Sequence, residues 1–387
     1  MPQHPAHLPV PPADAQALSG RLTAFIAEDL RARGGWISFA RFMELALYAP
    51  GMGYYSAGSR KFGAAGDFVT GPELSPLFGR CIARQLAELV AQGVPDIVEV
   101  GAGSGALAAD ILRELAALER LPERYLILEV SADLRERQQA TLAERAGPWR
   151  DRVQWLEVLP AHLHAVVLGN EVLDAIPTQI VRMQGSGLQE IGVTLDEAGA
   201  LVWAPRPAQG ELLVAARELA LPDGYQTEVN LAARAFVQSF ARLLDRGMLL
   251  LVDYGFPARE LYHPQRAQGT LMCHYRHHAH DDPLVLVGLQ DITAHVDFTA
   301  VAHAGVAAGM EVLGYANQAH FLINCGITDL LSGVSPDDVH TYAPLAAHAQ
   351  QLLSPTEMGE LFKVIALGKG IAGPLRGFAR GDKSHTL

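Results

Sequence analysis

The stretch Val98-Glu99-Val100-Gly101-Ala102-Gly103-Ser104-Gly105-Ala106-Leu107 decides the fold of this 387-residue chain. A short apolar run leads directly into three glycines at alternate positions, and a helical pattern begins at Ala106. Glycine lets the backbone turn sharply and approach a ligand closely, while a helix N-terminus offers N–H donors without intrahelical partners. The sequence therefore predicts a nucleoside-binding loop between a strand and a helix.

Two carboxylates sharpen this prediction. Glu99 lies two residues before the first glycine, where it can accept the ammonium group of a methionine moiety. Glu129 ends the next strand, where an acidic residue can accept hydrogen bonds from both ribose hydroxyls. This combination favours S-adenosylmethionine as the cofactor. The predicted cofactor-binding residues are Glu99, Gly101, Ala102, Gly103, Ser104, Gly105, Glu129 and Asn170.

An NAD-dependent oxidoreductase is the alternative for this loop, because Ala106 completes a G-x-G-x-x-A spacing. Two observations count against it. A carboxylate just before the glycines is poorly placed beside a pyrophosphate, and about 95 residues precede this strand, whereas many dinucleotide domains begin with it.

Outward from the loop, short apolar runs alternate with helical patterns. The runs at 96–100, 125–130, 153–156 and 165–169 are separated by helical patterns at 106–118 and 132–145. This alternation is typical of an α/β protein with a doubly wound, Rossmann-like sheet whose strands are covered on both faces. Further runs near 248–253, 310–316 and 361–367 bring the count to seven core strands, and we expect the last two to form an antiparallel hairpin at one edge.

The predicted domains follow from where this alternation starts and stops. Residues 255–296 are interpreted as a polar, His-rich loop within the core. The segments are a disordered leader (1–19), an N-terminal helical, substrate-covering region (20–92), the core (93–177 and 226–370), a β-rich insertion (178–225) and a flexible tail (371–387).

Composition excludes several classes of protein. The net charge of −12 argues against a nucleic-acid binder, which presents a basic face to phosphates. No apolar run approaches the roughly 18–20 residues of a membrane helix, so we expect no membrane insertion. The three cysteines are widely spaced and match neither a disulfide framework nor a zinc module, which fits a reducing cytoplasm. Nothing in the composition excludes a homodimer.

A second polar cluster, Asn170-Glu171-Val172-Leu173-Asp174, follows the fourth strand. Ligands of doubly wound folds meet the carboxyl ends of strands, so Asn170, Glu171 and Asp174 are expected beside the transferable methyl group. Helix capping is the alternative explanation for these three residues.

With these residues in hand, the sequence resembles the MidA-like methyltransferases, which include a mitochondrial complex I assembly factor that methylates arginine. The likeness covers about residues 20–367 and follows an ordered set of motifs. These are PGMGYY at 50–55, GDFVTGPE at 66–73, the loop at 99–105, NEVLDAIP at 170–177, DYG at 253–255, DITAHVDF at 291–298 and MGELF at 358–362. The resemblance implies a seven-stranded class I methyltransferase sheet and a substrate-covering region.

The resemblance also implies methyl transfer to an arginine side chain of a protein, giving symmetric dimethylarginine on a complex I subunit in the mitochondrial member. A protonated guanidinium is a poor nucleophile, and carboxylates on two sides can hold its planar fork. The candidate clamp is Glu171 and Asp174 with Asp67 or Glu73. The mitochondrial relative reads His-Glu-Phe-Phe-Asp where this chain has residues 170–174, so both acids are kept but the first residue differs. A non-catalytic assembly factor that binds adenosylmethionine is the alternative function.

Four further groups of residues are candidates for either a functional or a structural role. Asp253 either lines the cleft or belongs to a strand-end turn, and Asp297 is most simply a helix N-cap. The Cys273 and His-rich cluster at 273–282 matches no zinc spacing, so no metal is predicted. The aromatic residues Tyr48, Tyr54, Tyr55 and Phe62 either cover the active site or pack in a core.

Overall fold

The computed structural model describes residues 8–57, 70–129 and 131–387. The chain divides into two compact units, and each is assembled from three separate segments. The first unit is Met1–Phe68, Asp174–Ala233 and Ala258–His295; the second is Val69–Leu173, Arg234–Pro257 and Val296–Leu387.

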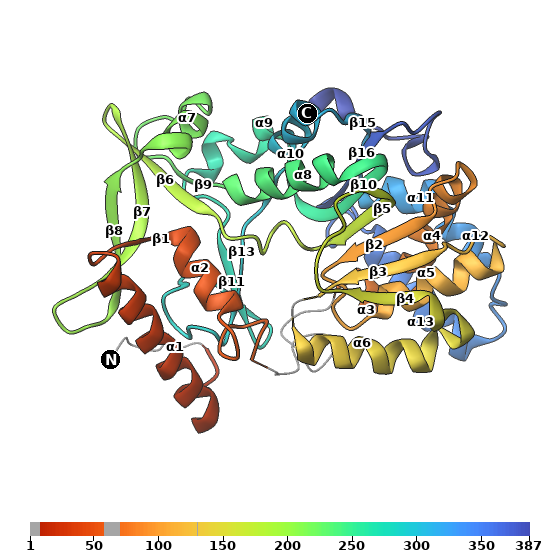
Figure 1. Ribbon diagram of the computed structural model, residues 1–387, viewed down its shortest axis with the longest axis horizontal. Coiled ribbons are helices and arrows are strands. Elements are labelled where there is room, and N and C mark those ends of the chain that lie inside the picture. The colour runs from red at the N-terminus through yellow and green to blue at the C-terminus, as the bar shows by residue number, and fades with distance from the viewer. Residues whose placement is uncertain (1–7, 58–69, 130) are drawn as a thin grey trace. The chain divides into compact units, whose positions relative to one another are not determined.

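The second unit is built on a mixed sheet with the strand order β15-β16-β10-β5-β2-β3-β4, and the short β14 adds to β10 (Figure 1). β2, β3, β4, β5 and β10 run parallel, while β16 is antiparallel to both β10 and β15. The strands are β2 (Asp96–Val100), β3 (Arg124–Leu128), β4 (Val153–Leu156), β5 (Leu163–Asn170), β10 (Leu244–Phe256), β14 (Val296–Asp297), β15 (Glu311–Asn317) and β16 (Phe362–Lys369). The predicted class I methyltransferase sheet is confirmed. Its last two main strands pair antiparallel at one edge as expected, although three helices separate them, so they are not a hairpin.

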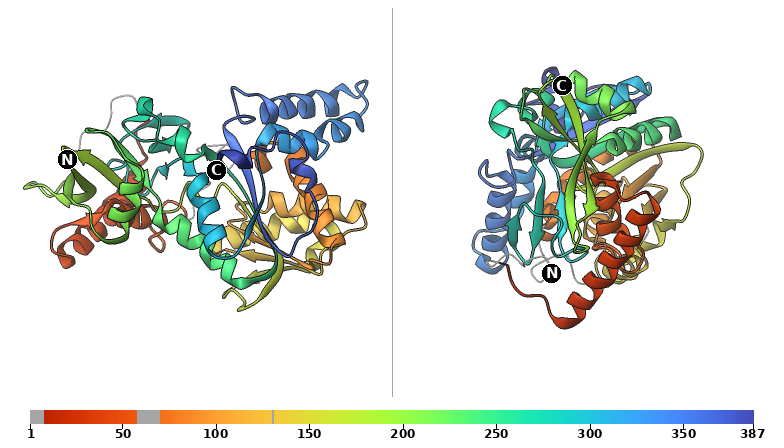
Figure 2. Two further views of the ribbon diagram at one scale, coloured as in Figure 1. Left: turned by 90° about the horizontal axis from the view of Figure 1, so that it is seen from above. Right: turned by 90° about the vertical axis from the view of Figure 1, so that its left-hand side faces the viewer.

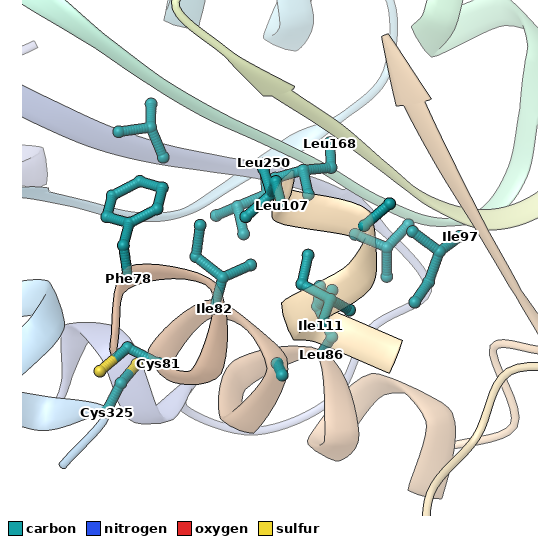
Figure 3. Packing of buried hydrophobic residues seen from close by; sticks show 14 of the residues in the cluster. Phe78, Cys81, Ile82, Leu86, Ile97, Leu107, Ile111, Leu168, Leu250 and Cys325 are labelled. Atoms are coloured by element: carbon teal, nitrogen blue, oxygen red, sulfur yellow. The ribbon is translucent and has the colours of Figure 1, made fainter. Parts of the chain in front are cut away.

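Helices cover both faces of this sheet (Figure 2). On one face, Phe78 and Ile82 of one helix and Ile111 of the next pack towards the strands in a single apolar cluster (Figure 3). On the other face, Gly305 of α10 lies against Leu367 of β16. A Cβ added to Gly305 would lie 2.7 Å from Leu367 Cδ1, so the backbone of α10 packs closely on the strand. The helices are α3 (Gly71–Leu74), α4 (Pro76–Ala91), α5 (Ala106–Ala117), α6 (Ala132–Arg145), α8 (Leu231–Leu243), α10 (Phe298–Ala307), α11 (Gln318–Asn324), α12 (Ile327–Ser332) and α13 (Val339–Leu353).

The first unit is antiparallel. One sheet has the order β1-β7-β6-β9, with β8 on the other side of β7, and a second has the order β12-β11-β13. The strands are β1 (Ile37–Ser38), β6 (Gln179–Gln184), β7 (Gly187–Leu195), β8 (Leu201–Pro207), β9 (Gln226–Val229), β11 (Met272–Tyr275), β12 (His278–His280) and β13 (Asp291–Thr293). The helices are α1 (Ala13–Ala32), α2 (Phe39–Tyr48), α7 (Gly210–Glu218) and α9 (Ala258–Leu261). The predicted β insertion therefore shares a sheet with the N-terminal segment, because β1 pairs with β7.

Four boundaries drawn from the sequence differ from the structure. The predicted N-terminal region at 20–92 is divided, because α3 and α4 belong to the second unit. Residues 255–296 are not a loop of the core: β11, β12 and β13 form a sheet there, and Cys273 and Ile292 are buried in the first unit. The described part of the leader is ordered, since Leu8 is buried and α1 already begins at Ala13. The tail is packed, since Phe378 is buried and the Lys383 N–H donates to the Tyr315 carbonyl at 2.6 Å.

Two further observations complete the description. No helix among the described residues is long and apolar enough to cross a membrane. The three cysteines, Cys81, Cys273 and Cys325, are buried and free, and burial raises the pKa of the Cys81 thiol to about 12.

Candidate active site

The glycine loop joins β2 to α5, and two of its glycines have neighbours that differ. Gly101, Gly103 and Gly105 all have positive φ, at 67°, 53° and 86°, where side chains are strained. A Cβ at Gly103 would meet no atom of the described residues within 4 Å, so they leave the space beside it open to a ligand. A Cβ at Gly105 would instead lie 3.1 Å from the Cα of Gln138, so this glycine allows α5 and α6 to approach.

The register of the parallel strands brings the predicted cofactor residues to one edge. Val100 lies opposite Leu128 of β3 and opposite Gly169 of β5. Gly101, Glu129 and Asn170 therefore follow three neighbouring strands at their carboxyl ends, the edge where doubly wound folds bind ligands. The N-terminus of α5 lies directly after this loop, and its N-cap is Gly105.

Glu99 is a buried carboxyl with one strong partner. Its side chain is 2% exposed, and its Oε2 accepts a hydrogen bond of 2.7 Å from the Tyr125 hydroxyl. Burial raises the pKa of Glu99 to about 7; the hydrogen bond from Tyr125 opposes this, and the charge of Glu129 adds to it. Tyr125 is neutral and leaves the carboxylate without a charge partner from this hydrogen bond, so Glu99 is suited to bind an ammonium group.

Glu129 is held from two sides after β3. Its Oε1 accepts from the Ser131 N–H at 2.9 Å, and its Oε2 accepts from the Gln138 side-chain amide at 3.1 Å. The same amide donates to the Gly103 carbonyl at 3.1 Å. The carboxylate expected to bind the ribose is thus connected to the glycine loop by one side chain.

Glu73 also lies at this loop. It belongs to the short helix α3, and its Oε1 accepts a hydrogen bond from the Ser104 hydroxyl. The structure therefore places Glu73, predicted as part of the clamp, against a predicted cofactor residue in the same unit.

Glu171 is held in an unusual backbone conformation at the end of β5. Its φ is 52°, in the left-handed region that a residue other than glycine rarely adopts. The Glu171 N–H donates to the Val252 carbonyl at 2.8 Å, and the Asn170 amide donates to Glu171 Oε1 at 2.9 Å. Buried Asp253 accepts from the Leu173 N–H at 2.8 Å and from the Tyr254 N–H at 2.9 Å, so it positions this segment from β10.

Asp174 begins the middle segment of the first unit, where it is buried. Its carbonyl accepts from the Ala294 N–H at 3.1 Å, and the next carbonyl, of Ala175, accepts from the Tyr48 hydroxyl at 3.0 Å. The predicted clamp is therefore divided: Glu73 and Glu171 belong to the second unit and Asp174 to the first. Asp67 lies outside the described residues.

Of the aromatic residues in the motif region of the first unit, Tyr54 is buried in the core, and Tyr48 and Tyr55 are partly buried against it. Tyr48 and Tyr55 stack with ring centroids 5.4 Å apart, and Tyr54 meets Tyr55 edge-on at 5.0 Å. The Tyr55 hydroxyl donates to buried Asp291 at 2.9 Å, which joins the motif at 50–55 to the motif at 291–298. Phe62 lies outside the described residues.

The remaining polar candidates, Asp297 and the His-rich segment, take part in a helix cap and in strand pairing. Asp297 is an N-cap as expected, because it accepts from the Ala300 N–H at 3.0 Å. In the His-rich segment, Cys273 pairs with His280 across β11 and β12. Among the residues that the structure describes, no three His, Cys, Asp or Glu side chains are grouped so as to hold a metal ion.

Gln138, Tyr125 and the Tyr55–Asp291 pair are not predicted by the sequence. Gln138 lies in a polar helix and Tyr125 in an apolar strand, and neither has a local signal that points to a carboxylate. The pairing of Tyr55 with Asp291 joins positions 236 apart in the chain. A polar residue at a buried helical position, as at Gln138, is the one hint that the sequence offers.

The donor set at this edge fits S-adenosylmethionine. The buried carboxyl of Glu99 suits its ammonium group, the open side of Gly103 admits a ligand to the backbone, and the Glu129 carboxylate suits vicinal hydroxyls. A pyrophosphate would instead meet two carboxyl groups, so the dinucleotide alternative fits the same residues poorly.

Comparisons with known proteins agree with this geometry. Residues 77–316 match a family model described as an S-adenosyl-L-methionine-dependent methyltransferase. The chain is 30% identical to the mitochondrial protein arginine methyltransferase NDUFAF7 of Danio rerio, over 86% of this chain and 83% of that protein. It is 27% identical to the human protein of the same name, over 86% of this chain and 80% of that protein.

A solved structure is more similar still. A protein from Burkholderia thailandensis, crystallised with S-adenosyl-homocysteine, is 52% identical and covers 98% of this chain and 100% of its own, with a TM-score of 0.95. The matched family model and the ordered motifs indicate the same family. The chain belongs to the family of S-adenosyl-L-methionine-dependent methyltransferases.

Proposed function

We propose that this protein transfers the methyl group of S-adenosylmethionine to an arginine side chain of a protein, and that the acceptor is a subunit of a respiratory complex I-type enzyme. The relatives named protein arginine methyltransferase support the acceptor class. The cytoplasm is the proposed location, from the free cysteines, and a homodimer is compatible with the composition.

Glu171 carries this proposal. Backbone strain at a residue other than glycine persists only where surrounding contacts impose it, and such residues cluster at functional sites. Here the Val252 carbonyl, the Asn170 amide and the Asp253 carboxylate hold the segment at the end of β5. This arrangement presents a carboxylate at the edge where the cofactor residues lie, which is what a cationic acceptor requires.

The chemistry divides between cofactor and protein. The cofactor, when bound, supplies an activated methyl group on a sulfonium. The chain's residues then bind, orient and exclude water: Glu99 takes the ammonium group, Glu129 the ribose hydroxyls, and the glycine loop admits the ligand to the backbone.

The acceptor side is assigned to carboxylates. Glu171 accepts hydrogen bonds from the guanidinium, and Glu73 of the same unit is the second carboxylate of the proposed clamp. Because the guanidinium is protonated at neutral pH, carboxylates that hold two of its nitrogens orient the third towards the methyl group. The new N–C bond forms as the S–C bond breaks, S-adenosylhomocysteine leaves, and the attacking nitrogen releases one proton.

The test is methylarginine analysis of a complex I-containing membrane fraction from cells that lack this protein. The fraction is incubated with purified protein and isotopically labelled S-adenosylmethionine, hydrolysed, and analysed by mass spectrometry. We expect labelled symmetric dimethylarginine with the wild type and with Glu311→Gln, an exposed control glutamate at the start of β15, and at least about a 100-fold loss with Glu171→Gln. Label on a residue other than arginine would refute the acceptor class. S-adenosylhomocysteine binding without label in any arm would favour a binding role.

A further inference from the structure

Gln138 is a buried amide in an otherwise polar helix. Within α6, which the structure describes throughout, Gln138 and Leu142 are the buried residues, and Gln138 is 0% exposed. Burying a side-chain amide is unfavourable unless its polar atoms are hydrogen-bonded. The position therefore calls for a reason beyond apolar packing.

Three hydrogen bonds use both ends of this amide. Nε2 donates to the Gly103 carbonyl and to Glu129 Oε2, both at 3.1 Å, and Oε1 accepts from the Trp155 indole N–H at 2.8 Å. The indole N–H is a donor only, so the carbonyl end must face Trp155. The two amide protons must then face Gly103 and Glu129, since the reversed amide would set an oxygen against two other oxygens.

The amide thus connects three elements that meet the cofactor edge. It links the glycine loop after β2 to the carboxylate after β3, and Trp155 of β4 fixes its orientation. The other oxygen of Glu129 accepts from the Ser131 N–H at 2.9 Å, so the carboxylate is held in rotation as well as in place. The helix itself is close, because a Cβ at position 105 would lie only 3.1 Å from the Gln138 Cα.

We infer that Gln138 is a positioning residue that sets how strictly the cofactor's ribose is recognised. It holds the Glu129 carboxylate at a fixed distance from the glycine loop, so that both ribose hydroxyls meet it together. Without this link Glu129 Oε2 loses the amide that holds it beside the glycine loop, and the binding energy that depends on the 2′-hydroxyl falls more than that of the rest of the ligand.

The experiment measures affinity for two probes by calorimetry: S-adenosylhomocysteine and its 2′-deoxyribose analogue. The ratio of their dissociation constants reports ribose recognition and does not depend on the methyl acceptor. The variants are Gln138→Leu and, as a matched control on the same helix, Gln139→Leu, which is exposed. Circular dichroism and thermal melting check that each variant folds.

We expect the wild type and Gln139→Leu to prefer S-adenosylhomocysteine by about 10-fold or more, the effect of losing one hydrogen bond to a carboxylate. In Gln138→Leu we expect this ratio to fall to about threefold or less. A structural role alone would weaken both probes equally and leave the ratio unchanged, and that result overturns the inference. A wild-type ratio near one overturns it too, without affecting the methyltransferase assignment.

A second variant covers the case in which Gln138→Leu does not fold. Trp155→Phe keeps an aromatic ring in β4 but removes the donor that fixes the amide orientation. We expect it to fold and to show a ratio between those of the wild type and Gln138→Leu. A wild-type ratio in Trp155→Phe would contradict the role given to the amide orientation.

Discussion

The two units of this chain are assembled in opposite ways. In the second unit, parallel strands are joined by helices, and β2, the glycine loop, α5 and β3 follow each other within about 35 residues. In the first unit, antiparallel strands pair across long stretches: β1 at Ile37 pairs with β7 at Val193, and Tyr55 bonds to Asp291. The cofactor residues therefore lie close together in the sequence of one unit. The motifs of the first unit come together only through contacts between distant segments of the chain.

This comparison predicts that substitutions in the second unit change cofactor binding and that those in the first unit leave it intact.

Glu129→Ala should weaken S-adenosylhomocysteine binding by about 100-fold or more. The substitution removes a carboxylate expected to accept two ribose hydroxyls, and each hydrogen bond to a charged group contributes about 1.5–3 kcal/mol. Calorimetric titration measures the loss, with Glu311→Gln as an exposed control in the same unit. Unchanged affinity would remove Glu129 from the site.

Tyr55→Phe should lower the free energy of unfolding by about 1.5–3 kcal/mol, because it removes a donor from the buried Asp291 carboxylate. Burial, and then the nearby Asp291, raises the pKa of Tyr55 well above its ordinary value, so the hydroxyl stays a donor across the accessible pH range. Urea unfolding gives the stability. If cofactor binding belongs to the second unit, the affinity of Tyr55→Phe for S-adenosylhomocysteine should stay within about twofold of the wild-type value. A larger loss would contradict this separation of the two units.

Affinity for S-adenosylhomocysteine should rise by about 10-fold between pH 6 and pH 8. Burial raises the pKa of Glu99 to about 7, so the free protein holds this proton at pH 6 and has lost it at pH 8, and the ligand's ammonium group prefers the carboxylate. Glu99→Gln should bind more weakly at pH 8 and show a flat profile between the two pH values. A sloping profile in that variant would assign the titration to another group.

The same group gives a stability prediction of defined sign. The pKa of Glu99 is higher in the folded protein than its ordinary value of 4.5, so between about pH 4.5 and pH 7 the folded state binds more protons than the unfolded state. Its contribution therefore destabilises the ligand-free protein as pH rises through this window. Chemical unfolding of the wild type should show this decline, and Glu99→Gln should lack it.

Tyr48→Phe should have the smallest effect, about 0.5–1.5 kcal/mol of stability, since it removes a neutral hydrogen bond to the Ala175 carbonyl. Denaturant unfolding at one pH measures it. Because Tyr48 belongs to the first unit, cofactor affinity should not change. A loss of affinity larger than that caused by Tyr55→Phe would contradict this ranking.

Local patterns predicted the second unit well. The bounds of α6 and β4 agree with the sequence prediction, and the glycine loop lies where the apolar run ends. Each of these features is decided within a few residues by periodicity or by a capping residue such as Ser131, which accepts from the Leu134 N–H.

What the sequence did not predict depends on long-range contacts. The sequence predicts a loop at residues 255–296 because β11, β12 and β13 are only three or four residues long, and β11 and β12 carry histidines. Their sheet forms through pairing such as Cys273 with Ile292. The positive φ of Glu171 is likewise stabilised by β10, through the Val252 carbonyl and the Asp253 carboxylate. No glycine or other local sequence signal predicts this conformation.

Hydrogen–deuterium exchange of the whole protein, with and without S-adenosylhomocysteine, tests the central claim most directly. We expect slower exchange on ligand binding in the glycine loop and in the segment from Glu129 to Gln138. We expect no change in the β6–β7–β8 sheet of the first unit. Protection confined to that sheet, with unchanged exchange in residues 99–105, would contradict the assignment of cofactor binding to the second unit.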